Sequence, residues 1–308
     1  MLLSENWPDL LTPVFFKIFT ADFMRWSKEE SNLADIYRVE TTTRNFEKIS
    51  FASALGDFEE FGGTVNYGDT YQGYDRRYEF TEYTKGIKVE RKLADDDMYG
   101  VMNDQPSELA HSAYRTREKH GAETFNEAFT SENTATEGGY LDASGNPTEL
   151  CASDHANAGD SETQNNEGTS TFAPAAVETT RRNMRAFRGD VSEIAGANMD
   201  TLIIPDALEE QAYEIINSKG KVDVATNNVN FHYGRYKMIV WPNFLTDSNN
   251  WFGVDYRLMK KLLFWWERIA LEFAQDKNSN TYVAQYTGYM RYNKGPADWR
   301  FIYGHKVA

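Results

Sequence analysis

Residues 77–89 read Arg-Tyr-Glu-Phe-Thr-Glu-Tyr-Thr-Lys-Gly-Ile-Lys-Val, and the large apolar residues stand at even positions before Glu82 and at odd positions after it. A period of two is typical of a β-strand with one face buried. The apolar residues occupy one face as far as Phe80 and the opposite face from Tyr83 onward. The apolar side of the predicted strand therefore changes near Glu82.

A second strand-like run, Phe-Glu-Lys-Ile-Ser-Phe at residues 46–51, precedes the first. The glycines between the two runs are Gly56, Gly62, Gly63, Gly68 and Gly73. We predict an extended two-stranded hairpin between Arg44 and Leu93 with a glycine-rich tip. Because an isolated ribbon is only marginally stable in water, this hairpin should rest on something else.

Apolar residues crowd the N-terminal segment, which is interrupted by Pro8 and Pro13. They are Trp7, Leu10, Leu11, Val14, Phe15, Phe16, Ile18, Phe19, Phe23 and Trp26. This much apolar surface on a terminal arm needs a partner to cover it.

Two helices are expected further along the chain. Asp104 or Ser107 can cap a long helix that runs to Thr130, and its apolar stripe is narrow, so it is either half solvated or covered by another chain. A second helix begins near Pro174 and ends at Gly189. Its polar face carries Arg181, Arg182, Arg185 and Arg188. We favour an acidic protein partner for this face over plain solvation or nucleic acid.

Between these helices, residues 132–172 contain eight acidic residues and no Lys or Arg. The acidic residues are Glu132, Glu137, Asp142, Glu149, Asp154, Asp160, Glu162 and Glu167. This segment is expected to be a solvated, loop-rich excursion, because burial of uncompensated carboxylates is costly.

The C-terminal half predicts a compact strand–helix region. Thr201–Ile204 is a short apolar strand that runs into a helix, and residues 236–241 and 251–254 are expected to be strands of the same region. Residues 262–273 fit both the helical and the strand period. Residues 281–292 alternate cleanly, and we expect residues 299–303 to pair with them.

Composition limits the class of protein. The 308 residues are 41% hydrophobic, which is enough for a real core, and the formal net charge of −15 argues against a dedicated nucleic-acid binder. The single cysteine, Cys151, cannot form an intramolecular disulfide. No signal peptide or membrane span is evident, so we expect a soluble protein that folds in the cytoplasm.

Searches for catalytic and metal-binding motifs fail. Residues 218–222 lack the earlier glycine and the hydroxyl of a phosphate-binding loop. Cys151, Asp154 and His155 are zinc-binding residue types, but they are too few without a distant fourth ligand. We therefore predict no enzyme activity, no catalytic residue, no cofactor and no metal.

Five short stretches accompany this order of elements: Phe-Asn-Glu-Ala-Phe at 125–129, Glu-Leu-Cys-Ala-Ser-Asp-His at 149–155, Thr-Leu-Ile-Ile-Pro-Asp-Ala-Leu at 201–208, Asn-Asn-Trp-Phe at 249–252 and Trp-Arg-Phe-Ile-Tyr-Gly at 299–304. The order of the predicted elements and these five stretches together resemble the major capsid (head) protein of tailed double-stranded DNA bacteriophages, which has the Hong Kong ninety-seven fold. The resemblance is more specifically to the phage Mu-like major head subunit.

The resemblance implies an α+β tailed-phage capsid fold with five parts. They are an N-terminal arm at 1–45, an extended β-hairpin loop at 46–93, a peripheral domain at 94–194 with a spine helix at 104–131, an axial domain at 195–275 and peripheral return strands at 276–308.

The implied function is structural: a protein that self-assembles into the icosahedral head shell enclosing the viral double-stranded DNA. Its partners would be further copies of itself in pentamers and hexamers, a separate scaffold, a portal and decoration proteins. It would enclose DNA without sequence-specific binding, contact no membrane, assemble in the host cytoplasm and reside in the virion. The alternative is an acidic mixed α/β enzyme or a carbohydrate-binding module with an aromatic groove.

Residues expected to contact neighbouring subunits come from the arm, the hairpin and the arginine-bearing helix. They are Trp7, Phe15, Phe16, Phe46, Phe51, Phe58, Phe61, Tyr78, Phe80, Arg181 and Arg185.

Overall fold

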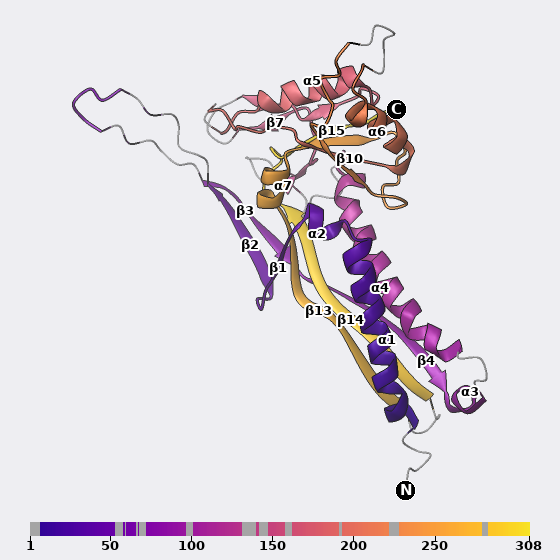
Figure 1. The fold of residues 1–308 in the computed structure, drawn as a ribbon. Helices are drawn as coiled ribbons and strands as arrows, with labels where there is room; N and C mark the ends of the chain where they lie inside the picture. Colours follow the sequence, from indigo (N-terminus) through magenta and orange to yellow (C-terminus); the bar gives the residue numbers. More distant parts are fainter. Residues whose placement is uncertain are drawn as a thin grey trace.

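The structure is a computed structural model of the 308-residue chain. It describes residues 7–308 apart from 53–57, 59, 66, 68–71, 97–100, 131–139, 142–146, 158–161, 191–192, 222–227 and 279–282. Two sheets of different size organise the described residues, and the longest helix runs from one to the other (Figure 1).

The first is a long four-stranded sheet with the strand order β1-β13-β14-β4. Its strands are β1 (Arg38–Thr41), β13 (Leu263–Asn278), β14 (Val283–Pro296) and β4 (Thr81–Glu90). β13 and β14 form a long antiparallel pair, β4 is antiparallel to β14, and β1 is parallel to the first residues of β13. We call this the long sheet.

Two long helices cover one face of the long sheet, α1 (Trp7–Glu29) and α4 (Val101–Asn126), and they lie side by side (Figure 1). Phe15 and Phe19 of α1 are buried at a spacing of four residues, so they share the face that packs on the sheet. Phe15 lies 5.0 Å from the ring of Tyr286 on β14. The apolar N-terminal segment is therefore a helix covered largely by its own chain.

The N-terminal segment is not interrupted at its prolines. Pro8 falls in the first turn of α1, where its missing N–H needs no partner. Pro13 lies inside the helix, and its exposed position leaves room for the ring on the solvent side.

The second sheet is compact and five-stranded, with the order β11-β10-β12-β15-β9. Its strands are β10 (Thr201–Ile204), β11 (Lys237–Val240), β12 (Trp251–Val254), β15 (Ile302–His305) and β9 (Glu167–Gly168). The helices α5 (Pro174–Arg185) and α6 (Glu209–Asn217) belong to this region, and a 3-10 turn (Asp206–Leu208) leads into α6. We call it the compact sheet, and the main hydrophobic core lies around it.

A two-stranded ribbon, β2 (Phe46–Ala52) paired antiparallel with β3 (Gln72–Glu79), stands beside the long sheet. Short elements complete the fold. They are α2 (Leu33–Ile36), α3 (Arg91–Asp96), α7 (Tyr256–Leu262) and the two-residue strands β5 (Tyr140–Leu141), β6 (Pro147–Thr148), β7 (His155–Ala156) and β8 (Thr163–Gln164).

The predicted hairpin is correct for residues 46–79, where β2 pairs with β3, but not for the residues that follow. The chain leaves the ribbon at Phe80 and enters the long sheet as β4, where it pairs with β14. Tyr78 and Phe80 pack with Trp266 on one side, whereas Val89 packs beneath α1 on the other. The change of apolar side near Glu82 therefore marks the passage from one sheet to another.

Three further expectations are corrected. The long helix spans Val101–Asn126 rather than 104–131. Residues 299–303 do not pair with 281–292, because β14 pairs with β13 and β4 while β15 joins the compact sheet beside β12. The ambiguous stretch 262–273 is almost entirely strand, the first part of β13.

The acidic segment is partly confirmed. Its described carboxylates, Glu149, Asp154, Glu162 and Glu167, are exposed or half-buried. The backbone between them is anchored, because Asn166 is buried and donates through Nδ2 to the carbonyl oxygens of Leu150 and Ile302. Glu132, Glu137, Asp142 and Asp160 lie outside the described residues.

Candidate intersubunit surfaces

The loop between β2 and β3 carries a cluster of exposed apolar side chains. Its described members are Phe58, Phe61, Val65 and Tyr67, with relative exposures of 108%, 71%, 63% and 86%. Residues 60–65 lie well away from both sheets (Figure 1). Complete burial of one large apolar side chain is worth about 1.5–3 kcal/mol, so this cluster, the loop patch, is well suited to contact another molecule.

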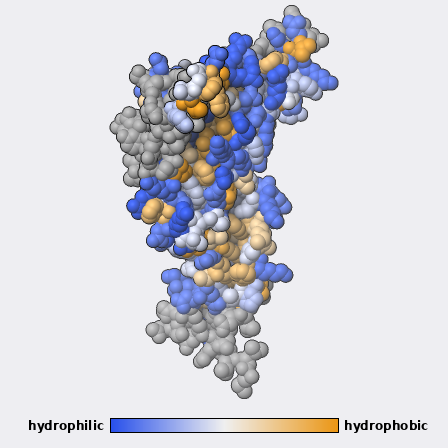
Figure 2. Space-filling model, turned by 90° about the vertical axis from the view of Figure 1, so that its left-hand side faces the viewer, coloured by the Kyte–Doolittle hydropathy of each residue, from blue (hydrophilic) through white to orange (hydrophobic). Residues whose placement is uncertain are grey.

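A second exposed apolar surface lies on the outer side of α1. Val14, Phe16 and Met24 are 47%, 51% and 54% exposed, whereas Phe15 is fully buried. One helix thus has an inner face that stabilises the fold and an outer face available for contact. Figure 2 shows apolar patches along the length of the subunit, interspersed with hydrophilic side chains.

The structure divides the residues that were expected to contact neighbours. Phe16, Phe46, Phe58, Phe61 and Arg185 are exposed and Arg181 is half-buried. Phe15, Tyr78 and Phe80 are buried within one chain, at 0%, 0% and 6% exposure, so their own fold already covers them. Their burial leaves these three side chains little or no surface for a subunit contact. The side chains of Trp7 and Phe51 lie outside the described residues.

A cavity of about 570 Å³ opens between α5, α6 and the loop 228–236. It is lined by Pro174, Ala175, Glu178, Arg181, Arg182, Ile215, Lys221, Asn230, Phe231 and His232. Phe231 is 43% exposed, and the guanidinium carbons of Arg181 and Arg235 lie 5.1 and 3.8 Å from its ring centroid. We call this the arginine groove.

The charges of the arginine groove are partly paired. Arg181 donates to both carboxylate oxygens of Glu178, at 2.8 and 2.6 Å, and Arg182 donates to one of them at 2.8 Å. These hydrogen bonds, those of Arg181 above all, lower the pKa of Glu178 to about 2. Burial lowers the pKa of His232, which therefore lines the groove as a neutral ring at pH 7. Among the described lining residues, three cations against one carboxylate give the groove a positive balance.

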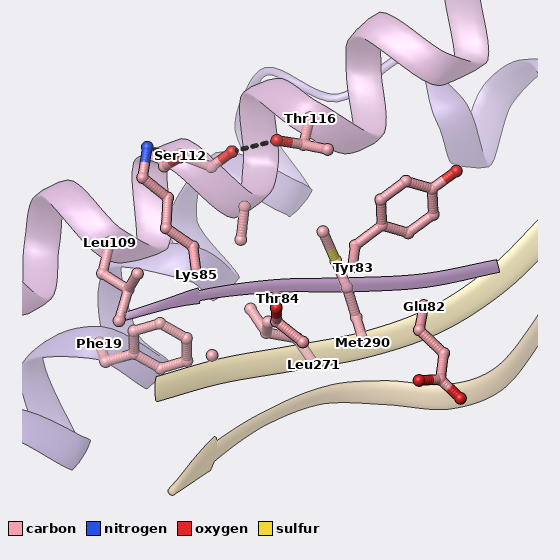
Figure 3. A pocket seen from close by; sticks show the side chains of 12 residues that line it. Phe19, Glu82, Tyr83, Thr84, Lys85, Leu109, Ser112, Thr116, Leu271 and Met290 are labelled. Atoms are coloured by element: carbon pink, nitrogen blue, oxygen red, sulfur yellow. Dashed lines mark hydrogen bonds between the residues drawn. The ribbon is translucent and has the colours of Figure 1, made fainter. Parts of the chain in front are cut away.

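A smaller cavity of about 380 Å³ lies between α4 and β4 (Figure 3). Leu109, Leu271 and Met290 supply apolar walls, and Lys85 on β4 extends across to α4. There the Lys85 Nζ donates a 3.0 Å hydrogen bond to Ser112 Oγ. The cavity is therefore a gap in helix–sheet packing that one lysine spans.

The zinc-type residues near Cys151 do not converge. Cys151 is buried, and burial raises the pKa of its thiol well above the usual range. His155 stacks on Trp299 with 4.4 Å between ring centroids, and its Nε2 is 3.0 Å from Asn166 Oδ1, whereas Asp154 is exposed. Within the described ranges, no three metal-binding side chains gather. None of the described helices is long and apolar enough to cross a bilayer.

Sequence reasoning missed one exposed group, Val229, Phe231 and Tyr233, at 83%, 43% and 48% exposure. These residues alternate with polar ones in Asn-Val-Asn-Phe-His-Tyr-Gly, which resembles a strand in sequence. The structure instead holds them in a loop, where Asn230 caps the end of α6 by donating to the carbonyl oxygens of Ile215 and Ser218.

Solved structures of viral and virus-like shells share this fold. The chain aligns over 90% of its length with 90% of a capsid chain of an empty GTA particle, at 14% identity and a TM-score of 0.56. It aligns over 90% of its length with 88% of a capsid chain of the cyanophage P-SCSP1u, at 10% identity and a TM-score of 0.57. A virus-like particle chain from Pyrococcus furiosus is similar at 10% identity over 95% of this chain and 99% of that one, with a TM-score of 0.54. No curated protein matches the sequence significantly.

The long sheet with its spine-like helix, the compact sheet and the projecting ribbon define a structural shell protein with the tailed-phage capsid fold, not an enzyme. A family model described as phage capsid protein matches residues 73–304. The chain belongs to that family. The alternative of an enzyme or carbohydrate-binding module is not supported, and the closer resemblance to phage Mu-like subunits stays a prediction.

Proposed function

We propose that this chain is the major subunit of an icosahedral head, and that copies associate as pentamers and hexamers around the viral double-stranded DNA. The loop patch carries the proposal. Its apolar side chains project beyond the fold that could cover them, and a neighbouring copy is the partner that a repeating shell always supplies.

The domain roles follow from the same proposal. We assign the N-terminal arm to residues 1–45 and end the extended loop, which begins at 46, at Phe80 instead of 93, because β4 belongs to the long sheet. The long sheet and α4 would form the peripheral domain, and the compact sheet the axial domain. Because β13 belongs to the long sheet, we end the axial segment that begins at 195 at Leu262 instead of 275.

Scaffold, portal and decoration proteins remain proposed partners, and assembly in the host cytoplasm remains a proposed location. The net charge of −15 supports enclosure of DNA without sequence-specific binding, because a surface of this sign repels phosphates.

The test removes the loop with the first residues of β3 and leaves the long sheet and the compact sheet intact. Replacing residues 54–74 by a short Gly-Ser linker should preserve the thermal unfolding of the subunit and abolish closed particles in sedimentation and electron microscopy. A full-length control with Phe58, Phe61, Val65 and Tyr67 changed to Ser separates the apolar contact from loop length. Normal shells from the linker variant would show that the loop is not an intersubunit clasp.

A further inference from the structure

The arginine groove combines an apolar floor with a positive rim. Ile215 is buried beneath it, and the partly exposed ring of Phe231 forms one wall. Arg182 and Lys221 are both exposed at its edge, in a chain whose overall charge is −15. Such a surface favours a ligand with an apolar or aromatic anchor flanked by negative charge.

The loop patch has that chemistry. Residues 57–61 read Asp-Phe-Glu-Glu-Phe, which places two aromatic rings among three carboxylates. Phe58 and Phe61 are strongly exposed and Glu60 is exposed between them. The described part of this loop lies far from α5 and α6 of its own chain (Figure 1). A groove on another copy is therefore the natural site for it.

We propose that residues 57–61 of one subunit dock in the arginine groove of a neighbouring subunit. One phenyl ring enters beside Phe231, and the carboxylates face Arg182 and Lys221. This inference rests on the proposed function and names the site that receives the loop. The volume of about 570 Å³ is in the range of pockets that enclose small aromatic ligands.

Charge and anchoring residues favour this segment over another acidic stretch of the chain. Residues 132–142 contain three acids but a single aromatic residue, Tyr140. Residues 57–61 supply two rings within four positions, so one can enter the groove while the other covers its edge. Phe231 is flanked by two guanidinium groups, which makes its neighbourhood suitable for carboxylates as well as for a ring.

A disulfide trap tests the contact in assembled particles of the full-length chain. Gly62→Cys keeps the acidic-aromatic motif, and Asn228→Cys lies beside the groove, because the Lys221 N–H donates to the Asn228 carbonyl oxygen at 2.8 Å. The single native cysteine, Cys151, is buried and contributes little background. Mild oxidation should convert the double variant into a ladder of covalent oligomers that a reductant collapses.

The matched control pairs Gly62→Cys with Tyr213→Cys, an exposed position on α6 outside the groove, and should give no ladder. An equal ladder from the control would overturn the proposal. So would trapping of Asn228→Cys by Glu137→Cys in place of Gly62→Cys, since the occupant would then be the acidic segment.

A peptide titration tests the groove without particles. A peptide of residues 55–63 should bind the full-length chain, and Lys221→Glu or Phe231→Ala should weaken binding several-fold. Lys219→Glu, an exposed charge reversal that does not line the groove, should leave it unchanged. Equal binding to all variants would contradict the docking site. If the loop proves essential for shells while neither the trap nor the peptide reports on the groove, the docking site is wrong and the proposed function stands.

Discussion

Glu118 is a carboxyl group with no solvent exposure, at a point where three segments of the chain meet. It accepts hydrogen bonds from Ser31 Oγ and, at 2.7 Å, from the indole N–H of Trp241. Burial raises the pKa of Glu118, and these hydrogen bonds act in the opposite direction. This one side chain therefore ties α4 to the turn after α1 and to the compact sheet.

We expect Glu118→Ala to lower the free energy of unfolding by about 1–3 kcal/mol, because it leaves the Trp241 N–H buried without a partner. Denaturant unfolding measures the loss. Glu108→Ala, an exposed position on the same helix, is the matched control and should change stability little. Equal effects of the two substitutions would show that the buried carboxylate is not a structural tie.

Two buried histidines predict a loss of stability in acid. His155 stacks on Trp299 and His305 on Trp251, and burial lowers the pKa of each to about 4. The unfolded chain, with an ordinary pKa near 6.5, then binds more protons than the folded chain between these values. The stability that the two neutral rings contribute is fully present above about pH 6.5 and is lost as the pH falls towards 4.

The measurement compares thermal unfolding at pH 7 and pH 5 for the native chain and for His155→Gln/His305→Gln. The double variant is expected to be less stable at pH 7 and to lose less on acidification. His111→Gln, on α4, should keep the native acid response. An unchanged response in the double variant would show that the buried rings are not its source.

At the scale of elements, α1 presents adjacent residues to opposite environments. Phe15 packs against Tyr286 and Val89, whereas Phe16 is 51% exposed. We expect Phe15→Ala to cost about 3–5 kcal/mol of folding stability, the usual effect of emptying a core aromatic site. Phe16→Ala should leave the unfolding midpoint nearly unchanged and weaken particle formation. Equal unfolding midpoints for Phe15→Ala and Phe16→Ala would contradict this division of α1 into a core face and a contact face.

How far the sequence predicts an element depends on its environment. The helix α5 was predicted because its apolar residues recur at the helical spacing. The strands β10, β11 and β12 were predicted from short apolar runs, and β10 and β12 are buried at every position. The strand β9 was missed because it lies in the acidic segment that was expected to be a loop. Residues 262–273 fitted both periods because β13 is buried on both faces near its start: Trp265 contacts Tyr37 and Trp266 contacts Tyr78. The partner of residues 299–303 was wrong because strand pairing depends on the whole topology, which no local pattern encodes.

The same reasoning applies to the candidate contact surface. Exposure of Phe58 and Phe61 was predictable, because glycines surround them and no apolar periodicity offers them a core. The arginine groove was not predictable in full. Its arginines were found on α5, but Phe231 reaches them from a loop about fifty residues further along the chain, a proximity that arises only on folding.

At the scale of the whole molecule, the two sheets meet around the C-terminal half of α4. Gly121 lies there in contact with α2 and the compact sheet: a Cβ at this position would collide with Leu33 and lie 3.1 Å from the Trp241 ring. The absence of a side chain thus sets how closely the long helix approaches the compact region.

Gly121→Ala is therefore expected to destabilise the protein by about 1–3 kcal/mol, although alanine is the better helix former. Chemical denaturation measures the change. Gly62→Ala, where a Cβ meets nothing within 4 Å, is the control and should be neutral. A stabilised Gly121→Ala variant would mean that the two regions separate easily at this joint.

The continuity of β3 and β4 through Phe80 has a mechanical consequence. A neighbour that pulls on the loop pulls on β3, and the load passes along the backbone into β4, nearly parallel to the strand (Figure 1). Ten residue pairs join β4 to β14, and a force along the strand loads them together in shear instead of peeling them apart one by one. In a shell under outward pressure, the pull of a neighbouring subunit on the loop would thus be resisted by the long sheet along its strands, the direction in which its hydrogen bonds share the load.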